Sequence, residues 1–560
     1  MSEPVATGQP TGLRDHALGL ALCLVYVAVL LGTASELGLA RDEGMYVQAA
    51  EIYGRWLELL VREPAVALTQ EAIDQAFRVN REHPPLAKLL FALGHLVQQK
   101  YGLFATESAS YRFAGMLSAG LLLWLIYVFG TRVYGRMAGL FAALAYALLP
   151  RPFYHAHLDA FDVPITLAAT AVTYAYHRSL SDRRWALACG GLFGLALLTK
   201  HNSWILPGIF AIHFGIVAWT ERRSRRQGEP SRISLRPYWL LALVLLGPLL
   251  FFGGWPFLWH DTFARTRWYV AFHLKHDYYN MEYFGVNYFW PPFPMSYAWV
   301  MTFFTVPLTT LSLGLMGTAF ELKRTLRVLR DWLRARSAVA EVPEPTQTFW
   351  LLLGCMLAPL VLITVPSTPI FGGTKHWFPA YPFLALFAGH AFSQVVLAVR
   401  ARFAQQPWVQ ASPIVLGVWL LAPAWVETAH SHPFGLSHYT VAAGGVPGAA
   451  AYGMNRQFWG FTTGSLAPYL RATLPNGGTV YLCDTIYSAW QMLIRDGHIP
   501  ENIRATGDIS QADLALVHHE KHFAEVDHQI WTTYGSVRPA HVLTYDGVPI
   551  ISVYQNPRRR

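Results

Sequence analysis

The chain has 560 residues, of which 14% are charged and 53% are hydrophobic, and it holds 33 Phe, 27 Tyr and 20 Trp. An ordinary soluble domain carries about 25% charged residues, so this composition argues against one soluble enzyme; it also excludes a disordered chain. Four Cys exclude a disulfide scaffold, and the net charge of +9 fits either nucleic-acid binding or the basic cytoplasmic loops of a membrane protein.

Eleven apolar runs of the length that crosses a bilayer follow one another along the chain. The first run is long and lacks a small-residue cleavage site, so no signal peptide is expected. The sequence therefore predicts a polytopic α-helical membrane protein with about 11 transmembrane helices. The runs lie at 17–39, 112–130, 136–152, 163–179, 185–200, 203–220, 238–256, 297–318, 348–366, 377–398 and 411–428.

Basic residues are distributed unevenly between the two sides of this predicted bundle. If the N-terminus is cytoplasmic, Arg14 of the N-terminal segment and the loops on that side account for 20 of the 43 Lys and Arg. These loops are 131–136, 178–184, 221–236, 319–336 and 399–402. The opposite short loops hold chiefly Arg151, Lys200 and Lys375. The positive-inside rule then predicts a cytoplasmic N-terminus and an extracytoplasmic C-terminus. Because this asymmetry explains the net charge, no nucleic-acid partner is expected.

Three predicted outer segments are too long to be simple connectors. We expect a transmembrane domain over 1–428, with outer loops 40–111 and 257–296, and a small extracytoplasmic α/β domain over 429–560. In that domain TVYLCD and ADLALVHH read as strands. HVLTY and VPIISVYQ, joined by Asp546-Gly547, read as a hairpin. The segment 342–348 reads as a cytoplasmic linker.

Acidic residues and histidines gather at predicted outer helix ends. Asp42 and Glu43 follow the first span directly, and carboxylates at the bilayer edge are costly unless they are solvated or used. A solvated helix N-cap is the alternative interpretation. Glu82 and His83 precede a Pro pair that favours a helix start. The stretch YHAHLDAFDVP, 154–164, adds two His and two Asp; its His-x-His spacing allows a metal site without being diagnostic of one.

Three further outer loops supply Lys and His. They are Lys200-His201-Asn202, the stretch HLKHDYY at 273–279, and GGTKH at 372–376. Such side chains at one membrane level could together bind an anion such as a phosphate.

The order of these motifs resembles the GT-C membrane glycosyltransferases of family 39 type. That group includes the dolichyl-phosphate-mannose protein mannosyltransferases and the bacterial aminoarabinose transferases of lipid A. The resemblance covers roughly 17–400. The matching residues are Asp42, Glu43 and Tyr46; His83-Pro84-Pro85-Leu86; Asp162-Val163-Pro164; GLFGLALLTK at 191–200; and KHWFPAYPFLALFAG at 375–389.

The resemblance implies a polyprenyl-phosphate-dependent hexosyl- or pentosyltransferase of the inner or plasma membrane, which moves one sugar, with inversion, to an extracytoplasmic acceptor hydroxyl. The acceptor would be a lipid, a glycan or a protein. The tail resembles a bacterial subgroup and not the carbohydrate-binding-like domain of the eukaryotic enzymes, so their protein acceptor does not carry over.

The resemblance also assigns roles to residues. Asp42 is the expected base, and Asp162 and Glu43 are the other expected catalytic carboxylates, with Asp159 as a rival to Asp162. The expected ligands of the donor phosphate are Lys200, Lys375, His376 and His83. A divalent metal ion is the one cofactor that the resemblance allows; Glu82 would hold it, and His273 or His276, together with His376, could complete the site.

A transporter or flippase is the alternative function. Its ionisable residues would line a path across the whole bilayer. Here they gather at the outer helix ends while the middles of the spans are nearly free of charge, which favours an enzyme acting at the membrane interface. A sensor that uses the histidines of the tail is a weaker alternative, because those histidines lack the spacing of a metal site.

Overall fold

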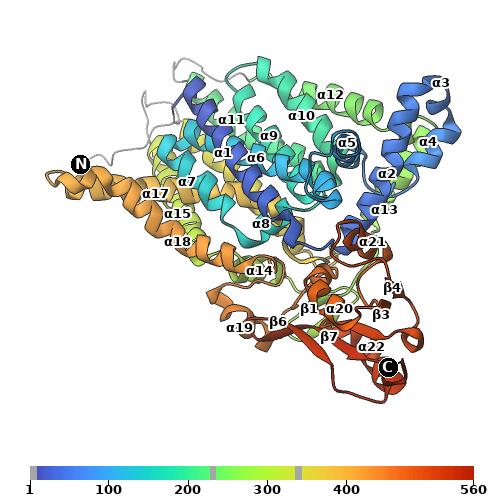
Figure 1. Ribbon diagram of the computed structural model, residues 1–560. Helices are drawn as coiled ribbons and strands as arrows, with labels where there is room; N and C mark the ends of the chain where they lie inside the picture. Colours follow the sequence, from blue (N-terminus) through green and yellow to red (C-terminus); the bar gives the residue numbers. More distant parts are fainter. Residues whose placement is uncertain (1–8, 227–234, 335–343, 560) are drawn as a thin grey trace.

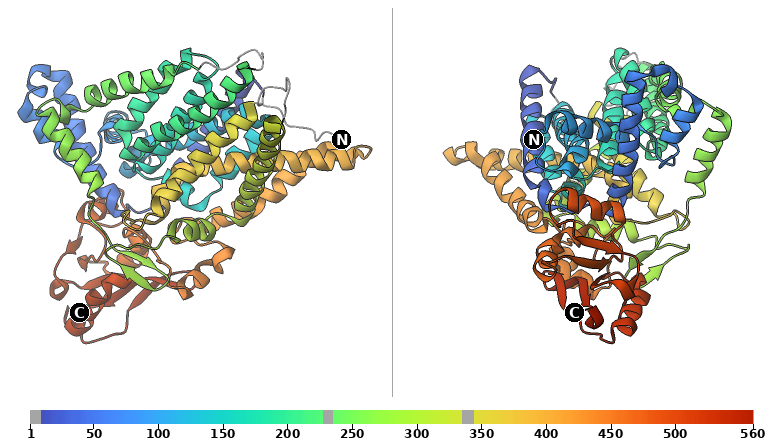
Figure 2. Two further views of the ribbon diagram at one scale, coloured as in Figure 1. Left: turned by 180° about the vertical axis from the view of Figure 1, so that it is seen from behind. Right: turned by 45° about the vertical axis from the view of Figure 1, so that its right-hand side comes forward.

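The computed structural model describes residues 9–226, 235–334 and 344–559. The middle of the predicted loop 221–236 and the start of the predicted linker 342–348 lie outside these ranges. Figure 1 shows a large helical body and, against one end of it, a smaller domain that contains the main sheet. The two views of Figure 2 show the same division.

The helical body runs to residue 431 and has eighteen α-helices among the described residues. Their bounds are α1 Leu13–Thr33, α2 Arg41–Arg62, α3 Pro64–Ala67, α4 Gln70–Phe77, α5 Leu86–Tyr101, α6 Glu107–Tyr134, α7 Arg136–Ala147, α8 Pro150–Ala156, α9 Asp162–Ser179, α10 Arg184–Thr199, α11 Leu206–Arg226, α12 Tyr238–Gly254, α13 Thr262–Leu274, α14 Tyr297–Thr305, α15 Leu308–Arg334, α16 Glu344–Ile363, α17 Tyr381–Arg402 and α18 Ser412–Ser431.

The predicted fold class, a polytopic helical membrane protein with a small α/β domain, is confirmed. Among the described residues, five helical segments are long and apolar enough to cross a membrane: Leu13–Glu36, Glu107–Tyr134, His201–Arg222, Gly373–Arg402 and Pro407–Ser431. Four shorter apolar helices accompany them: Arg136–Ala147, Arg184–Thr199, Tyr238–Gly254 and Gln347–Ile363. The number of eleven spans stays a prediction.

The expectation of one continuous helix over 297–318 is wrong. Helix α14 ends at Thr305, and α15 begins at Leu308 and continues to Arg334. Pro307 lies between them, and proline has no N–H to donate and clashes with the preceding turn. The chain therefore changes direction inside an apolar run whose composition alone reads as a single span.

Small residues let the membrane helices approach closely. A Cβ on Gly190 of α10 would lie 2.4 Å from the carbonyl oxygen of Ala242 in α12. A Cβ on Gly317 of α15 would lie 1.9 Å from the carbonyl oxygen of Phe387 in α17. No side chain fits at either point, so glycine sets the spacing of both helix pairs.

The predicted outer segments fold as distinct elements. The segment 40–111 forms helices α2 to α5, and 257–296 forms α13 and a two-stranded hairpin of β1 Met281–Tyr283 and β2 Val286–Tyr288. Helices α2 to α4 and α13 project together from one corner of the body (Figure 1).

The C-terminal domain is a five-stranded mixed sheet with helices on both faces. The strands are β3 Gly478–Tyr481, β4 Ile503–Thr506, β5 Leu514–His518, β6 His541–Tyr545 and β7 Val548–Gln555. The helices are α19 Gly445–Ala451, α20 Ala467–Thr473, α21 Tyr487–Arg495 and α22 Ala524–Tyr534.

The strand order is β4-β3-β5-β7-β6, with β3 parallel to both neighbours and β7 antiparallel to both of its neighbours. One core packs Val480 and Leu514 against Trp490 of α21, and Ile530 of α22 lies in a second core with Val517. Asp546 and Gly547 have φ of 50° and 75°, as the two-residue hairpin turn requires. The predicted strands and hairpin are thus confirmed.

Candidate active site beside the C-terminal domain

Asp42 lies in the first turn of α2, where the helical body meets the C-terminal domain. Its Oδ2 atom is 3.1 Å from Nζ of Lys375, and its Oδ1 atom is 4.0 Å from Nε of Arg41. Lys375 also lies over the ring of Trp459, 4.2 Å from the ring centroid. A helix N-terminus favours a carboxylate, and the two cations add to that preference. Asp42 is 26% exposed, so other molecules can reach it.

Asp162 begins α9 and is buried. Its Oδ1 atom is 2.7 Å from Nζ of Lys200, which follows α10, and its Oδ2 atom is 3.3 Å from Nδ1 of His155 in α8. Three elements that are separate in sequence therefore meet at this carboxylate. We call Asp42, Asp162, Lys200 and Lys375 the charge cluster.

Tyr46, one turn after Asp42, is close enough to both carboxylates of the charge cluster to be affected by their charges. The ring is 8% exposed and packs on Phe161 and His83. Burial raises the pKa of its hydroxyl well above the usual value, and the nearby charges of Asp42 and Asp162 raise it further. The phenol therefore stays protonated as a hydrogen-bond donor among carboxylates.

Glu43 lies outside the charge cluster and pairs instead with a buried arginine. Its carboxylate is 1% exposed and forms a paired contact with Arg112 of α6, with Oε1 2.8 Å from Nε and Oε2 3.0 Å from Nη2. Oε2 also accepts the backbone N–H of Ala40, and Oε1 accepts that of Asp159. Glu43 thus fixes the start of α2, next to Asp42. A direct catalytic role for Glu43 stays a prediction that this geometry does not favour.

The structure separates Asp162 from its rival, Asp159. Neither carboxylate oxygen of Asp159 has a hydrogen-bond partner among the described residues, and its side chain is buried beside Glu43. Burial and the Glu43 carboxylate raise the pKa of Asp159 well above the usual value. The carboxylate that pairs with Lys200 is that of Asp162.

His83 and His376 border the charge cluster without forming an ion pair in it. His83 packs against both Tyr46 and Phe161, and burial followed by the charges of Lys88 and Lys200 lowers its pKa. His376 directs Nε2 at the backbone of Phe371. Phosphate contacts from these two histidines therefore stay predictions.

The predicted metal ligands do not gather into a metal site. Among the described residues, no group of three or more His, Cys, Asp or Glu side chains is placed to hold a metal ion. Glu82 accepts a hydrogen bond from the amide of Asn80 at 2.6 Å, and its carbonyl oxygen is 2.8 Å from Nε2 of His273. His276 packs on Phe371, 5.1 Å between ring centroids. A divalent metal ion held by Glu82, His273 and His276 therefore stays a prediction.

Several residues at the site could not be found by motif. Arg112 begins an apolar run, and a lone Arg there gives no signal of its partner Glu43. Arg151 is 1% exposed, and its Nε and Nη1 atoms make no hydrogen bond to a described residue; the ring of Tyr439 lies 5.1 Å from its guanidinium. Asp484 lies in the C-terminal domain, far along the chain from Asp42, so only the fold brings the two together.

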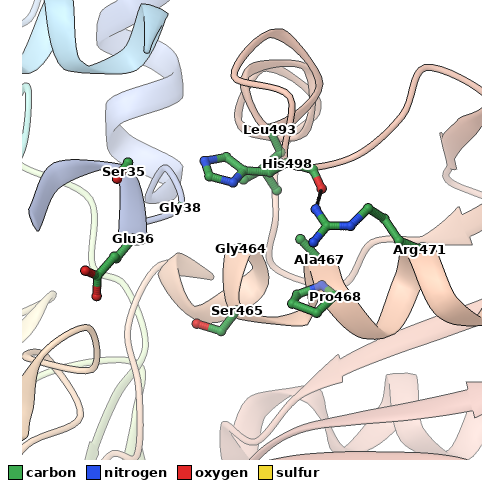
Figure 3. A pocket seen from close by; sticks show the side chains of 10 residues that line it. All are labelled: Ser35, Glu36, Gly38, Gly464, Ser465, Ala467, Pro468, Arg471, Leu493 and His498. Atoms are coloured by element: carbon green, nitrogen blue, oxygen red, sulfur yellow. Dashed lines mark hydrogen bonds between the residues drawn. The ribbon is translucent and has the colours of Figure 1, made fainter. Parts of the chain in front are cut away.

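A cleft of about 210 Å³ lies between the C-terminal end of α1 and the C-terminal domain. Figure 3 shows Glu36 and Gly38 on one side of it and Arg471 and His498 on the other. Arg471 donates to the carbonyl oxygen of His498. No predicted site residue lines this cleft, so it is separate from the charge cluster.

Residues 82–252 match the family model described as dolichyl-phosphate-mannose-protein mannosyltransferase. This part of the chain is therefore similar in sequence to that glycosyltransferase family. The matched range contains Asp162 and Lys200, which form the shortest ion pair of the charge cluster. The resemblance predicted from the sequence is confirmed over that range. A search of curated proteins finds no match.

Two solved proteins have a similar chain path at low sequence identity. ArnT from Cupriavidus metallidurans in the apo state is 16% identical, with 96% of this chain and 97% of that chain covered and a TM-score of 0.47. The same protein bound to undecaprenyl phosphate gives 16% identity, 97% and 98% coverage and a TM-score of 0.44. The oligosaccharyltransferase of Archaeoglobus fulgidus in its apo form is 12% identical, with 94% and 71% coverage and a TM-score of 0.47. Likenesses this distant do not by themselves identify a reaction.

Proposed function

We propose that this chain is an inverting glycosyltransferase that moves one hexose or pentose from a polyprenyl-phosphate-sugar donor to an acceptor hydroxyl. The reaction would take place on the extracytoplasmic face of the membrane. The charge cluster carries the proposal. It contains two pairs of a carboxylate and an ammonium group, Asp162 with Lys200 at 2.7 Å and Asp42 with Lys375 at 3.1 Å.

Asp42 is the base in this proposal. An acceptor hydroxyl has too high a pKa to attack at neutral pH without a positioned base. The hydroxyl proton passes to Oδ of Asp42 while the acceptor oxygen bonds to C1 of the sugar. The bond from C1 to the phosphate oxygen breaks on the opposite face, which inverts the anomeric centre. Asp42 suits this role better than Asp162, because Asp42 is 26% exposed and Asp162 only 7%.

Lys375 and Lys200 stabilise the leaving polyprenyl phosphate. Negative charge develops on the phosphate oxygen as the bond to C1 breaks, and fixed cations in a water-poor site stabilise it strongly. Each ammonium has three donors, so each can keep its carboxylate and still bind a phosphate oxygen.

The remaining assignments complete the proposal. Residues 1–428 form the transmembrane catalytic domain and 429–560 the extracytoplasmic domain, with a cytoplasmic N-terminus in the inner or plasma membrane. The prenyl chain lies among the apolar helices, whose membrane-facing side chains include Leu24 and Val25 of α1, 60% and 65% exposed. The acceptor is a lipid, a glycan or a protein that reaches the same face.

Incubation of the purified protein with a panel of radiolabelled polyprenyl-phosphate sugars, with and without a membrane lipid extract, tests the proposal. We expect one donor to be cleaved, with release of polyprenyl phosphate and transfer of the label to the extract. If no donor is cleaved under any condition, the proposal is wrong, and the transporter alternative gains support.

A further inference from the structure

The C-terminal domain touches the candidate active site through a row of alternating charges. Oδ1 of Asp484 is 3.0 Å from Nη1 of Arg41, and Nε of Arg41 is 4.0 Å from Oδ1 of Asp42. Oδ2 of Asp42 is in turn 3.1 Å from Nζ of Lys375. The row therefore links a carboxylate of the soluble domain to the proposed base.

Asp484 lies in the loop after β3, a strand whose two neighbours, β4 and β5, are both parallel to it. The chain passes from β3 to β4 on one side and later returns to β5 on the other side. In open α/β sheets this reversal is where the loops after the strands separate and where functional groups collect, at the carboxyl ends of the strands. The carboxyl ends of β3 and β5 here carry Asp484 and Glu520.

Both carboxylates at this sheet edge are more than nine-tenths buried. The side chain of Asp484 is 4% exposed and that of Glu520 is 7% exposed. Oε1 of Glu520 has no hydrogen-bond partner among the described residues. Burying a carboxylate costs free energy unless a cation compensates it. Arg41, which is 39% exposed, is the cation that Asp484 holds.

We propose that Asp484 is a positioning residue, through which the C-terminal domain holds Arg41 away from Asp42 and so keeps the proposed base available. This inference rests on the proposed function. A guanidinium freed from Asp484 could move from 4.0 Å to direct contact with Asp42. A carboxylate paired with Arg41 as well as Lys375 is a weaker base, since both cations favour its charged form.

The titration of Asp484 gives this role a pH dependence. Burial raises the pKa of Asp484 to about 6. The positive charge of Arg41 acts to lower this pKa, and the negative charge of Asp42 acts to raise it. The charged groups that face Asp484 are Arg41 and Asp42 on α2 and Glu520 after β5. Glu520 in turn faces Glu282 of the hairpin and lies 3.6 Å from His522. Above pH of about 6 Asp484 is charged and holds Arg41; below it the proton releases Arg41.

The test compares Asp484→Asn with Asp508→Asn in the full-length protein. Asp508 follows β4 at the same sheet edge, is exposed, and forms no contact with Arg41. The substrate is the polyprenyl-phosphate sugar that the wild-type protein cleaves, and kcat and donor KM are measured across the pH range. Asp484→Glu serves as the conservative variant.

We expect Asp484→Asn to lower kcat by about tenfold or more, while the donor KM stays within about twofold, because Lys200 and Lys375 are unchanged. The fall in rate on the acid side of pH about 6 should disappear in Asp484→Asn and remain in Asp508→Asn. Asp484→Glu should recover part of kcat. A wild-type kcat and pH profile in Asp484→Asn would overturn the inference. Absence of cleavage by the wild-type protein would overturn the proposed function, and this inference with it.

Discussion

Lys375 is the residue that touches most parts of the candidate site. It pairs with Asp42, lies over Trp459 and is 8% exposed. Its charge also contributes to the electrostatic environment of His155, which pairs with Asp162. A single ammonium therefore connects the proposed base to the second half of the charge cluster, which is where a donor phosphate would have to sit.

Replacing Lys375 should weaken the stabilisation of the leaving phosphate. We expect Lys375→Gln to lower kcat/KM for the donor by about 10²-fold or more, the effect of removing one fixed donor from a developing anion. Steady-state cleavage of the radiolabelled donor measures this. Lys100→Gln, at the exposed end of α5, is the matched control and should behave as wild type. Equal kcat/KM in Lys375→Gln and Lys100→Gln would remove Lys375 from the mechanism.

The sequence contains the individual groups of the site but not their pairing. Asp42, Asp162, Lys200 and Lys375 are recognisable because charge at an outer helix end is unusual in so apolar a chain. The pairing of Asp42 with Lys375 crosses most of the chain, and no local spacing encodes it. Residues adjacent in sequence can also have different partners. Asp42 pairs with Lys375 of the charge cluster, whereas the carboxylate of Glu43 pairs with Arg112.

At the scale of elements, helix contacts depend on which face of each helix carries glycine. Gly190 and Gly191 are adjacent in α10, but only Gly190 faces α12. The apolar periodicity of α10 does not reveal this difference, since both glycines lie in one hydrophobic run. Composition likewise predicts a single span over a run that Pro307 in fact divides into two helices.

This pair allows a sharp test of the packing of α10 on α12. A Cβ at Gly190 would meet the backbone of Ala242 at 2.4 Å, whereas nothing lies within 4 Å of a Cβ at Gly191. We expect overpacking in Gly190→Ala to lower the free energy of unfolding by about 1–3 kcal/mol. The unfolding midpoint of the protein in detergent should fall accordingly. Gly191→Ala should leave it unchanged or raise it slightly. If the two variants unfold alike, Gly190 does not set the spacing of α10 and α12.

At the scale of the whole molecule, the sheet domain lies against one end of the helical body (Figure 1), and Asp484 of that domain pairs with Arg41 of α2. The C-terminal domain could be anticipated from its strand patterns and its Asp546-Gly547 turn. Its contact with α2 could not, because the Asp484–Arg41 pair depends on how two separately folded parts come together. Membrane sidedness is a further property of the whole chain, and the distribution of basic loops predicts it.

The proposed topology predicts opposite accessibility for two introduced cysteines. With Cys483 replaced by Ser, Ser231→Cys lies in the predicted cytoplasmic loop, and Gln529→Cys lies on the exposed face of α22. We expect a membrane-impermeant maleimide to label intact cells at 529 and not at 231, and to label both after permeabilisation. The other native cysteines are buried. Labelling of position 231 from outside intact cells would contradict the topology.

The turnover of Asp42→Asn tests the proposed chemistry most directly. The matched control is Glu58→Gln, further along the same helix α2 and outside the charge cluster. With the donor that the wild-type protein cleaves, we expect Asp42→Asn to fold and insert normally and to lose about 10²–10⁴-fold in kcat, the contribution of a general base. Glu58→Gln should keep the wild-type rate. Wild-type turnover by Asp42→Asn would contradict the assignment of Asp42 as the base.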